Sequence, residues 1–221
     1  MQNNFNKSYT GVRQDLFKFL DGKYEKVLDV GCATGANAKY LKEEGLAAEV
    51  TGIEYDIDMS EIAKANNDYF FCGDLNNESF RKKIVDNSTY FDLIIFGDIL
   101  EHLVDPWSVL KEFSQLLSSE GIVLISLPNI QHIELFIQVF IKGKWPLNPR
   151  GIFDKTHLRW FTYKNVLDLV EFSGLRINHY EPTYRSRDPI GSKFNWKYKI
   201  LKKINPKWFV FQHKLICVRE K

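Results

Sequence analysis

The stretch VLDVGCATG, residues 27–35, decides the fold of this chain. It begins as an apolar run interrupted by Asp29 and continues into small residues that include Gly31 and Gly35. A helical pattern follows at once and stops at Gly45. This order predicts a buried strand that passes through a tight turn into a helix, the unit that opens a nucleotide site in α/β folds. Glycine permits backbone angles that other residues avoid, so the main chain of such a turn can approach a ligand closely.

The spacing of the turn differs from the dinucleotide fingerprint G-x-G-x-x-G. Ala33 occupies the position of the second glycine, and Asn37 lies beyond Gly35. The unpaired N–H groups of the helix start still favour an anionic group above the strand. Taken alone, however, the turn is weak evidence for a ligand site, and a tight loop between a strand and a helix explains it better.

Three further apolar runs each lead into an acidic residue. They are residues 50–54 with Glu54, residues 69–72 followed by Gly73 and Asp74, and residues 91–96 followed by Gly97 and Asp98. Glu54 lies about 20 residues beyond the turn, where α/β folds place a ribose-binding carboxylate. Because ligands bind at the carboxyl ends of strands in open α/β sheets, the four strand ends indicate one shared site.

These motifs resemble those of the class I S-adenosylmethionine-dependent methyltransferases. The matching segments are LDVGCATG at 28–35, GIE at 52–54, GDL at 73–75, and FDLI at 91–94 running on to EHL at 101–103. The resemblance covers roughly residues 25–180 in order, and the combination of motifs is more specific than any single one. Ala33 departs from the pattern, because many members carry glycine there. We expect the turn to survive, since alanine is small.

The resemblance implies S-adenosylmethionine as the cofactor and S-adenosylhomocysteine as its product. Backbone room for the methionine part is expected at the turn, from Gly31, Cys32, Ala33 and Gly35. Asp29 is expected either to order the turn or to meet the ammonium group. Asp98, after the fourth strand, is expected to face the methionine end.

The adenosine part is expected at the ends of the second and third strands. Glu54 would accept hydrogen bonds from the two ribose hydroxyls, with Tyr55 directly after it. Asp74 would accept from the adenine amino group, with Gly73 before it and Leu75 beside the ring.

Two histidines are candidates for the base that takes a proton from the methyl acceptor. His102 belongs to a Glu-His pair after the fourth strand, which members with oxygen acceptors often carry. His157 lies between Asp154 and Arg159, and Asp154 would either orient the imidazole or pair with the guanidinium. Histidine suits this task because its unperturbed pKa is about 6.5. For each histidine, a structural bond to a backbone carbonyl is an equally good interpretation.

No metal-ligating residue is predicted. A metal-dependent O-methyltransferase would show an acidic cluster beyond the fourth strand. Asp98, Glu101 and Asp105 leave that mechanism open, because their spacing is not diagnostic.

The alternation of strand and helix patterns predicts an α/β fold, a Rossmann-like doubly wound sheet with helices on both faces. The resemblance implies seven strands, mostly parallel, with a C-terminal antiparallel edge hairpin made by residues 175–184 and 209–219. All 221 residues are expected in one methyltransferase domain. Its additions are an N-terminal cap helix within 1–24, a lid over the substrate site at 129–160, and a basic helical segment at 185–208.

Local signals predict several boundaries. Asp105 and Pro106 open a helix that extends to Leu117 and is closed by Gly121, where a strand over 121–127 begins. Asp58 caps a helix with a glutamate three residues later. Thr162 caps another helix that runs to Gly174.

The N-terminal segment carries Tyr9 and Arg13, which in the family close over the cofactor, although we prefer a solvated Arg13. The lid carries an apolar stripe, expected to be packed core or a homodimer contact rather than a membrane anchor: Ile133, Phe136, Ile137, Phe140 and Ile141.

Of the cysteines, Cys32, Cys72 and Cys217, two lie at predicted strand ends and are expected to be buried thiols. No signal peptide or transmembrane run is recognised, and a cytoplasmic location is predicted.

The net charge of +2 hides an asymmetry. Residues 185–221 contain eleven Lys and Arg against two acids, a balance of +9, so the first 184 residues carry −7. This basic segment could bind nucleic acid or an anionic membrane surface. We favour a helix whose apolar face, Phe194, Tyr198 and Leu201, packs on the sheet while its lysines are solvated.

The sequence therefore predicts a methyltransferase that acts on a small-molecule acceptor, a hydroxyl on a sugar-like or other polar metabolite. The alternatives are an RNA- or membrane-associated methyltransferase that uses the basic segment, and a non-catalytic protein that only binds the cofactor.

Overall fold

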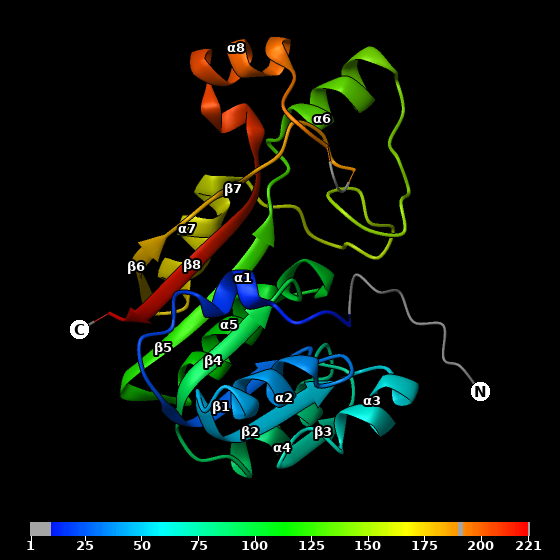
Figure 1. Ribbon diagram of the computed structural model, residues 1–221. Helices are drawn as coiled ribbons and strands as arrows, with labels where there is room; N and C mark the ends of the chain where they lie inside the picture. The colour runs from blue at the N-terminus through cyan, green and yellow to red at the C-terminus, as the bar shows by residue number, and fades with distance from the viewer. Residues whose placement is uncertain (1–9, 190–191, 221) are drawn as a thin grey trace.

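Figure 1 shows the computed structural model, which describes residues 10–189 and 192–220. Tyr9, expected beside the cofactor, lies outside the described residues. The strands are β1 (Tyr24–Val30), β2 (Ala47–Glu54), β3 (Tyr69–Cys72), β4 (Phe91–Gly97), β5 (Leu117–Pro128), β6 (Leu175–Tyr180), β7 (Thr183–Tyr184) and β8 (Val210–Arg219). The helices are α1 (Gln14–Phe17), α2 (Ala36–Glu43), α3 (Ile57–Ala63), α4 (Glu78–Asp86), α5 (Pro106–Ser114), α6 (Ile133–Leu135), α7 (Tyr163–Phe172) and α8 (Trp196–Ile204), with the short helices η1 (Leu100–His102), η2 (Phe136–Ile141) and η3 (Pro206–Phe209).

The strands form one sheet in the order β3-β2-β1-β4-β5-β8-β6, and β7 pairs with β8 at its start. Strands β1 to β5 are parallel, whereas β8 runs antiparallel to both β5 and β6. The predicted fold class, a mostly parallel sheet with an antiparallel edge hairpin, is confirmed. The strand order reverses at β1 and β4, and this switch point is where open α/β sheets bind ligands.

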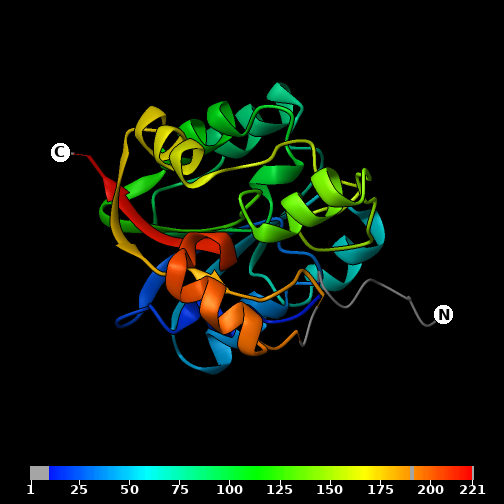
Figure 2. The ribbon, with the colours of Figure 1, turned by 90° about the horizontal axis from the view of Figure 1, so that it is seen from above.

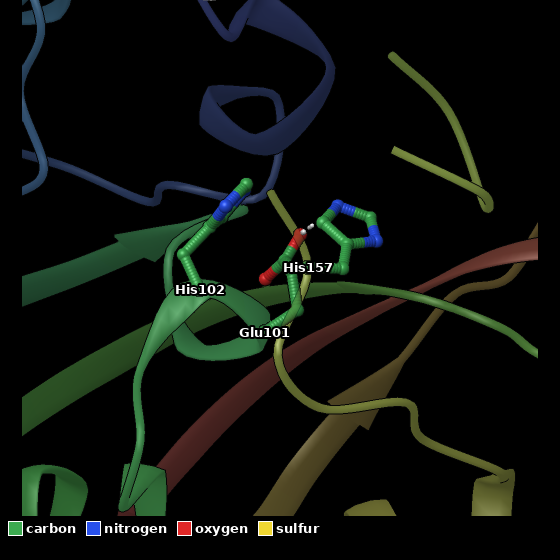
Figure 3. A group of neighbouring side chains, drawn as sticks. All are labelled: Glu101, His102 and His157. Carbon is green, nitrogen blue, oxygen red and sulfur yellow. Dashed lines mark ion pairs between the residues drawn. The ribbon is translucent and has the colours of Figure 1, made fainter. Parts of the chain in front are cut away.

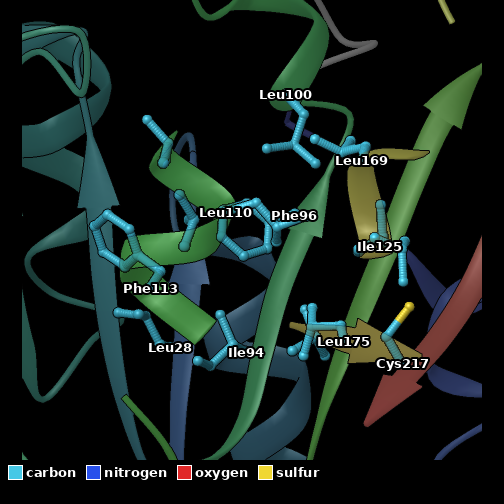
Figure 4. Close-up of a cluster of buried hydrophobic side chains, with 14 of the residues drawn as sticks. Leu28, Ile94, Phe96, Leu100, Leu110, Phe113, Ile125, Leu169, Leu175 and Cys217 are labelled. Atoms are coloured by element: carbon cyan, nitrogen blue, oxygen red, sulfur yellow. The ribbon is translucent and has the colours of Figure 1, made fainter. Parts of the chain in front are cut away.

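Helices cover both faces of the sheet, as Figure 2 shows from above. On one face, β1, β4 and β5 pack against α4, α5 and α7, and Figure 4 shows residues of this cluster, among them Leu28, Phe96, Phe113 and Leu169. On the other face, Leu16 and Phe17 of α1 and Leu41 of α2 pack against the same strands. Burial on both faces explains why the strand segments read as continuous apolar runs.

Two predicted helix starts are confirmed and one is wrong. Asp105 accepts a hydrogen bond from the backbone of Ser108, and Thr162 forms a capping box with Asn165. In contrast, α3 is capped by Asp56 and not by Asp58, because the helix begins one residue after Asp56.

The predicted boundary between the fifth helix and fifth strand is also wrong. Helix α5 ends at Ser114, and β5 already begins at Leu117. Gly121 lies inside β5, where the register shifts between the pairs Phe91–Leu117 and Leu93–Ile122. A Cβ atom on Gly121 would lie 2.8 Å from Leu117 Cδ1, so this glycine serves a strand irregularity rather than a helix end.

The N-terminal segment contains less helix than expected. Helix α1 has only four residues of the segment 1–24 in which a cap helix was expected, and Val12, two residues before it, is 37% exposed. The expectation for the cysteines is wrong at one position: Cys72 is exposed, while Cys32 and Cys217 are buried.

The lid and the basic segment extend beyond the carboxyl ends of the strands, at the top of Figure 1. The stripe on η2 is not packed core, because Phe136, Phe140 and Ile141 are 53%, 72% and 67% exposed. A homodimer contact there stays a prediction.

Helix α8 does not pack on the sheet as predicted. Phe194 and Tyr198 contact Phe209 of η3, while Leu201 stays 36% exposed. Within residues 10–189 and 192–220, no helix has the length and apolar character needed to cross a membrane.

Candidate functional site

A first cavity of about 540 Å³ opens at the carboxyl ends of β1 to β4. Nine of the predicted cofactor residues line it: Gly31, Cys32, Ala33, Glu54, Tyr55, Gly73, Asp74, Leu75 and Asp98. Two others, Asp29 and Gly35, do not. The strand ends that were predicted from separate motifs therefore meet around one space.

The turn after β1 has the backbone geometry that its glycines suggested. Gly31, Ala33 and Gly35 all have positive φ, at 74°, 49° and 72°. Ala33 thus adopts the left-handed conformation without glycine, and the expectation that the turn survives is confirmed. A Cβ on Gly31 would lie 2.9 Å from the side chain of Ile99, so the approach there is close.

Glu54 connects the turn to the end of β2. Its Oε2 accepts a hydrogen bond of 2.8 Å from the backbone of Ala33, and Oε1 accepts bonds of 2.9 Å from Tyr55 and Asp56. A carboxylate has about four lone-pair positions, so Glu54 keeps the capacity to accept one more hydrogen bond.

Asp29 lies behind the turn, not in the cavity. It is 1% exposed, and its Oδ2 accepts a hydrogen bond of 3.2 Å from Asn37. Asn37 Oδ1 in turn accepts from the backbone of Arg13. Burial raises the pKa of Asp29 to about 7. This geometry favours the first of its two predicted roles, ordering the turn.

At the far end of the first cavity, Asp74 and Leu75 follow β3. Asp74 is exposed, and its Oδ1 accepts hydrogen bonds from the backbone and side chain of Asn76. Leu75 is 5% exposed, and its carbonyl accepts from Arg81. This end therefore offers an acceptor beside an apolar wall.

Asp98 stands between the first cavity and a second one. It has a φ of 60°, which is uncommon for a residue other than glycine and concentrates at functional sites. Its Oδ1 accepts hydrogen bonds of 2.6 Å from Ser126 and Gln212, and its Oδ2 pairs with Arg13. Arg13 is therefore not solvated as we preferred: it bridges Asp98 and Asp15.

The second cavity, of about 730 Å³, adjoins the first and shares Arg13, Asp98 and His102 with it. The lid segment contributes residues 148–151, Asp154 and His157 to its wall. The two predicted histidines and Asp154 are thus brought together at the boundary of two adjoining cavities.

His102 is oriented by a chain of hydrogen bonds. Thr156 Oγ1 donates to Asp154 Oδ1 at 2.7 Å and lies 3.1 Å from His102 Nδ1. The carbonyl oxygen of Thr156 lies 3.3 Å from the same nitrogen, and a carbonyl can only accept a hydrogen bond. Nδ1 must therefore carry the proton of the neutral ring, which leaves the lone pair on Nε2. Burial lowers the pKa of His102, so the ring is neutral at pH 7.

Glu101 and His157 lie beside His102, as Figure 3 shows. Glu101 Oε1 is 3.9 Å from His157 Nε2, while Glu101 Oε2 and His157 Nδ1 lack a hydrogen-bond partner within the described part of the chain. Burial raises the pKa of Glu101 well above its ordinary value and lowers that of His157 to about 4. Ligand-type atoms of the three side chains lie within 4.8 Å of one another, a spacing that could hold a metal ion.

Two residues that the sequence suggested for the site, Arg159 and Asp105, lie apart from Glu101, His102 and His157. The Arg159 guanidinium donates to the carbonyls of Val104 and Leu158 and lines neither cavity. Asp105 caps α5, so the acidic cluster of Asp98, Glu101 and Asp105 does not form.

Some residues of the site were missed. Thr156 lies two residues after Asp154, a spacing typical of an Asx turn, and this signal was available. Ser126 and Gln212 gave no local signal, because Ser126 meets Asp98 through the pairing of β4 with β5, and Gln212 meets it through the pairing of β5 with β8. Arg150 and Arg185 of the second cavity were missed because they too come from segments far apart in the chain.

The sheet order, the glycine turn and the acidic strand ends around one cavity define the class I S-adenosylmethionine-dependent methyltransferases, as the sequence predicted. Residues 3–180 match the methyltransferase domain family. This match covers most of the chain, and the chain belongs to that family.

Three similar proteins place it further. The ubiquinone biosynthesis O-methyltransferase of Yersinia enterocolitica is 28% identical over 160 residues, covering 70% of this chain and 63% of the relative. That of Glaesserella parasuis is 32% identical over 134 residues, covering 58% and 56%. The chain thus spans less than two thirds of either relative. An S-adenosylmethionine-dependent methyltransferase structure from Mesorhizobium loti, 17% identical, shares the fold with a TM-score of 0.59 over 93% of this chain and 96% of that one.

Proposed function

We propose that this chain transfers a methyl group from S-adenosylmethionine to a hydroxyl oxygen of a small-molecule acceptor. The observation that carries the proposal is the shared boundary of the two cavities, where Asp98 and His102 line both. A cofactor in the first cavity and an acceptor in the second would meet there. The relatives named O-methyltransferases support oxygen as the acceptor atom.

The first cavity suits the cofactor by the chemistry of its walls. The Glu54 carboxylate can accept from one ribose hydroxyl and that of Asp74 from an adenine amino group, and Leu75 offers an apolar surface to the ring. The backbone at Gly31 has no side chain that would obstruct the methionine part. When bound, S-adenosylmethionine supplies an electrophilic methyl carbon on its sulfonium.

Two tasks remain for the protein. It must hold the acceptor oxygen in line with the methyl group, an alignment that can be worth ~7–11 kcal/mol. It must also take the proton of the hydroxyl.

We assign the second task to His102. Its Nε2 holds the lone pair at the boundary of the cavities, because Nδ1 is fixed by Thr156. Asp154 holds Thr156 and so acts as a positioning residue.

His157 is the weaker candidate for the base. Its pKa of about 4 makes it a poor proton acceptor at neutral pH, and the chain of bonds from Asp154 through Thr156 ends on His102 instead. The His157 ring packs edge-on against the His102 ring, with 4.8 Å between the two ring centres, and limits the rotation of the His102 ring.

The experiment that tests the proposal is an assay of S-adenosylhomocysteine formation. The purified protein is incubated with S-adenosylmethionine and a panel of phenols, sugars and sugar nucleotides. S-adenosylhomocysteine that forms only when an acceptor is present supports the proposal. The acceptor that is methylated, and the position of the new methyl group on it, decide between a sugar-like and a phenolic substrate. Cofactor binding without a single turnover on any acceptor would favour the non-catalytic alternative.

A second candidate function rests on α8. Trp196, Ile200 and Ile204 are 68%, 51% and 68% exposed along one side of the helix. Residues 189–213 contain six lysines and no acid. Exposed large apolar side chains beside lysines fit an anionic membrane surface better than a nucleic acid.

Sedimentation with anionic and neutral vesicles tests this second function. Binding only to anionic vesicles, lost in Trp196→Ala and Ile200→Ala together, supports membrane association. Salt-sensitive RNA binding instead would favour the nucleic-acid alternative. A cytoplasmic location stays a prediction.

A further inference from the structure

Two arginines that line the second cavity lack an ion pair with any of the described residues. The guanidinium carbon of Arg185 lies 3.8 Å from the centre of the Phe211 ring, and Arg150 lines the same cavity. Within residues 10–189 and 192–220, neither side chain lies within 4.0 Å of a carboxylate oxygen, although Asp188 attracts Arg185 from further away. Burial and the neighbouring charge of Arg150 both lower the pKa of Arg185. Two guanidiniums thus face the same space with donors to spare.

Three carboxylates of the same cavity attract Arg185 from beyond ion-pair distance, those of Asp188, Asp98 and Asp15, and each is engaged by another donor. Asp15 pairs with Arg13 and Lys214. Asp98 pairs with Arg13 and accepts from Ser126 and Gln212. Asp188 accepts from the backbone of Ile152 at 3.2 Å. These carboxylates therefore do little to neutralise the positive charges of Arg150 and Arg185.

Arg150 lies in the loop of residues 148–151, and Arg185 lies in the segment between β7 and α8, here called the strap. The loop and the strap are held together. Gly151 has a φ of 86°, and a Cβ there would overlap Asp188 Oδ1, so the loop of Arg150 lies directly against the segment of Arg185. Two residues after Arg185, Arg187 pairs with the buried Glu134 of the lid through bonds of 2.6 and 2.8 Å. Phe211 itself is buried, in a cluster with Ile152 and Phe153, and gives the Arg185 guanidinium a fixed surface.

We propose that the methyl acceptor carries an anionic group, a carboxylate or a phosphate, which Arg185 and Arg150 bind while its hydroxyl lies at His102. This inference rests on the proposed function and names its substrate class. Guanidinium groups recognise both anions through paired N–H donors. The anion would replace the water that hydrates them, and it would fix the acceptor by the end remote from the reacting oxygen.

The test compares acids with matched neutral compounds. Binding to the complex with S-adenosylhomocysteine is measured by calorimetry for 3,4-dihydroxybenzoate and its methyl ester, and for glucose 6-phosphate and glucose. We expect at least one acid to bind tenfold or more tightly than its neutral partner. The pair that shows the preference identifies carboxylate or phosphate as the anion.

Arg185→Gln and Arg150→Gln should each abolish most of that preference and leave affinity for the neutral partner unchanged. The matched control is Arg176→Gln, on the exposed face of β6 and outside both cavities. No preference for either acid in the wild-type protein, or a preference that survives both substitutions, would overturn the inference.

The failure of this inference is distinguishable from that of the proposed function. S-adenosylhomocysteine that binds normally, together with methyl transfer to neutral hydroxyl acceptors only, contradicts the anionic acceptor alone. Absence of cofactor binding contradicts the proposed function as well.

Discussion

The two cavities that meet at Asp98 are built in different ways. Around the first, most side chains come from the ends of parallel strands or from the residues that follow them directly. Around the second, the wall combines the lid, the strap between β7 and α8, and β8, and it is held by Arg187 with Glu134 and by Asp188 with Ile152. The first cavity is thus a product of the sheet, and the second is a product of segments added to it.

This difference separates the binding of the cofactor from the selection of the methyl acceptor. A site at a strand switch point is fixed by backbone geometry and tolerates little variation, which suits a common cofactor. Loops tolerate change, so the segments around the second cavity can set the acceptor. Substitutions should therefore affect cofactor affinity in the first cavity and turnover in the second, and the predictions for His102 and Glu54 test that division.

The largest effect is expected from His102→Ala. Loss of the base should lower kcat by ~10²–10⁴-fold and leave affinity for S-adenosylhomocysteine unchanged. Because burial lowers the pKa of His102, the wild-type rate should stay level through neutral pH and fall only on the acid side of about 6.5. A pH–rate profile and a cofactor titration check both points.

His179→Ala is the matched control, since His179 is exposed on β6 and lines neither cavity. Equal turnover in His102→Ala and wild type would remove general-base catalysis from the mechanism.

Glu54→Ala should act on binding rather than on chemistry. Charged hydrogen bonds contribute ~1.5–3 kcal/mol each, so we expect the Kd of S-adenosylmethionine to rise by roughly 10–100-fold. Glu49→Ala, at the start of the same strand, serves as the control. Unchanged affinity with a normal melting temperature would contradict the ribose role.

Asp29→Asn should change stability more than activity. The folded pKa of about 7 lies above the unfolded value of about 3.9, so the folded state keeps its proton longer as pH rises. The stabilisation from this group is complete below the unfolded pKa and is lost as pH rises to the folded pKa. The free energy of unfolding of the wild type should therefore decrease between about pH 4 and 7 through this group.

In the Asp29→Asn variant, whose amide has no proton to lose, that decrease should be smaller by roughly 2–4 kcal/mol. Denaturant titrations on either side of this range, at about pH 4 and above about pH 7, measure the difference. An identical pH dependence in both proteins would show that Asp29 is not buried as described.

The smallest effect is expected from metal removal. The raised pKa of Glu101 favours a neutral carboxyl group, and a protonated carboxyl is a poor cation ligand. Treatment with EDTA should change turnover by less than twofold. Activity that is lost with EDTA and restored by Mg²⁺, Mn²⁺ or Zn²⁺ would instead make Glu101, His102 and His157 a metal site.

The two cavities also differed in how far sequence predicted them. Glu54, Asp74 and Asp98 were found because each follows an apolar strand, a local pattern that fixes a position in space. The roles of Arg13, Arg150 and Arg185 depend on contacts between segments far apart in the chain, which no local pattern encodes. The error at Gly121 has the same origin, since only pairing with β4 shows that the residue serves a strand irregularity.

A crystal structure of the complex with S-adenosylhomocysteine tests the central claim most directly. We predict the ligand in the first cavity, with a ribose hydroxyl on Glu54, its adenine beside Leu75 and its sulfur directed toward His102. Density for the ligand in the second cavity, or a first cavity filled by side chains in the presence of saturating ligand, would contradict the account.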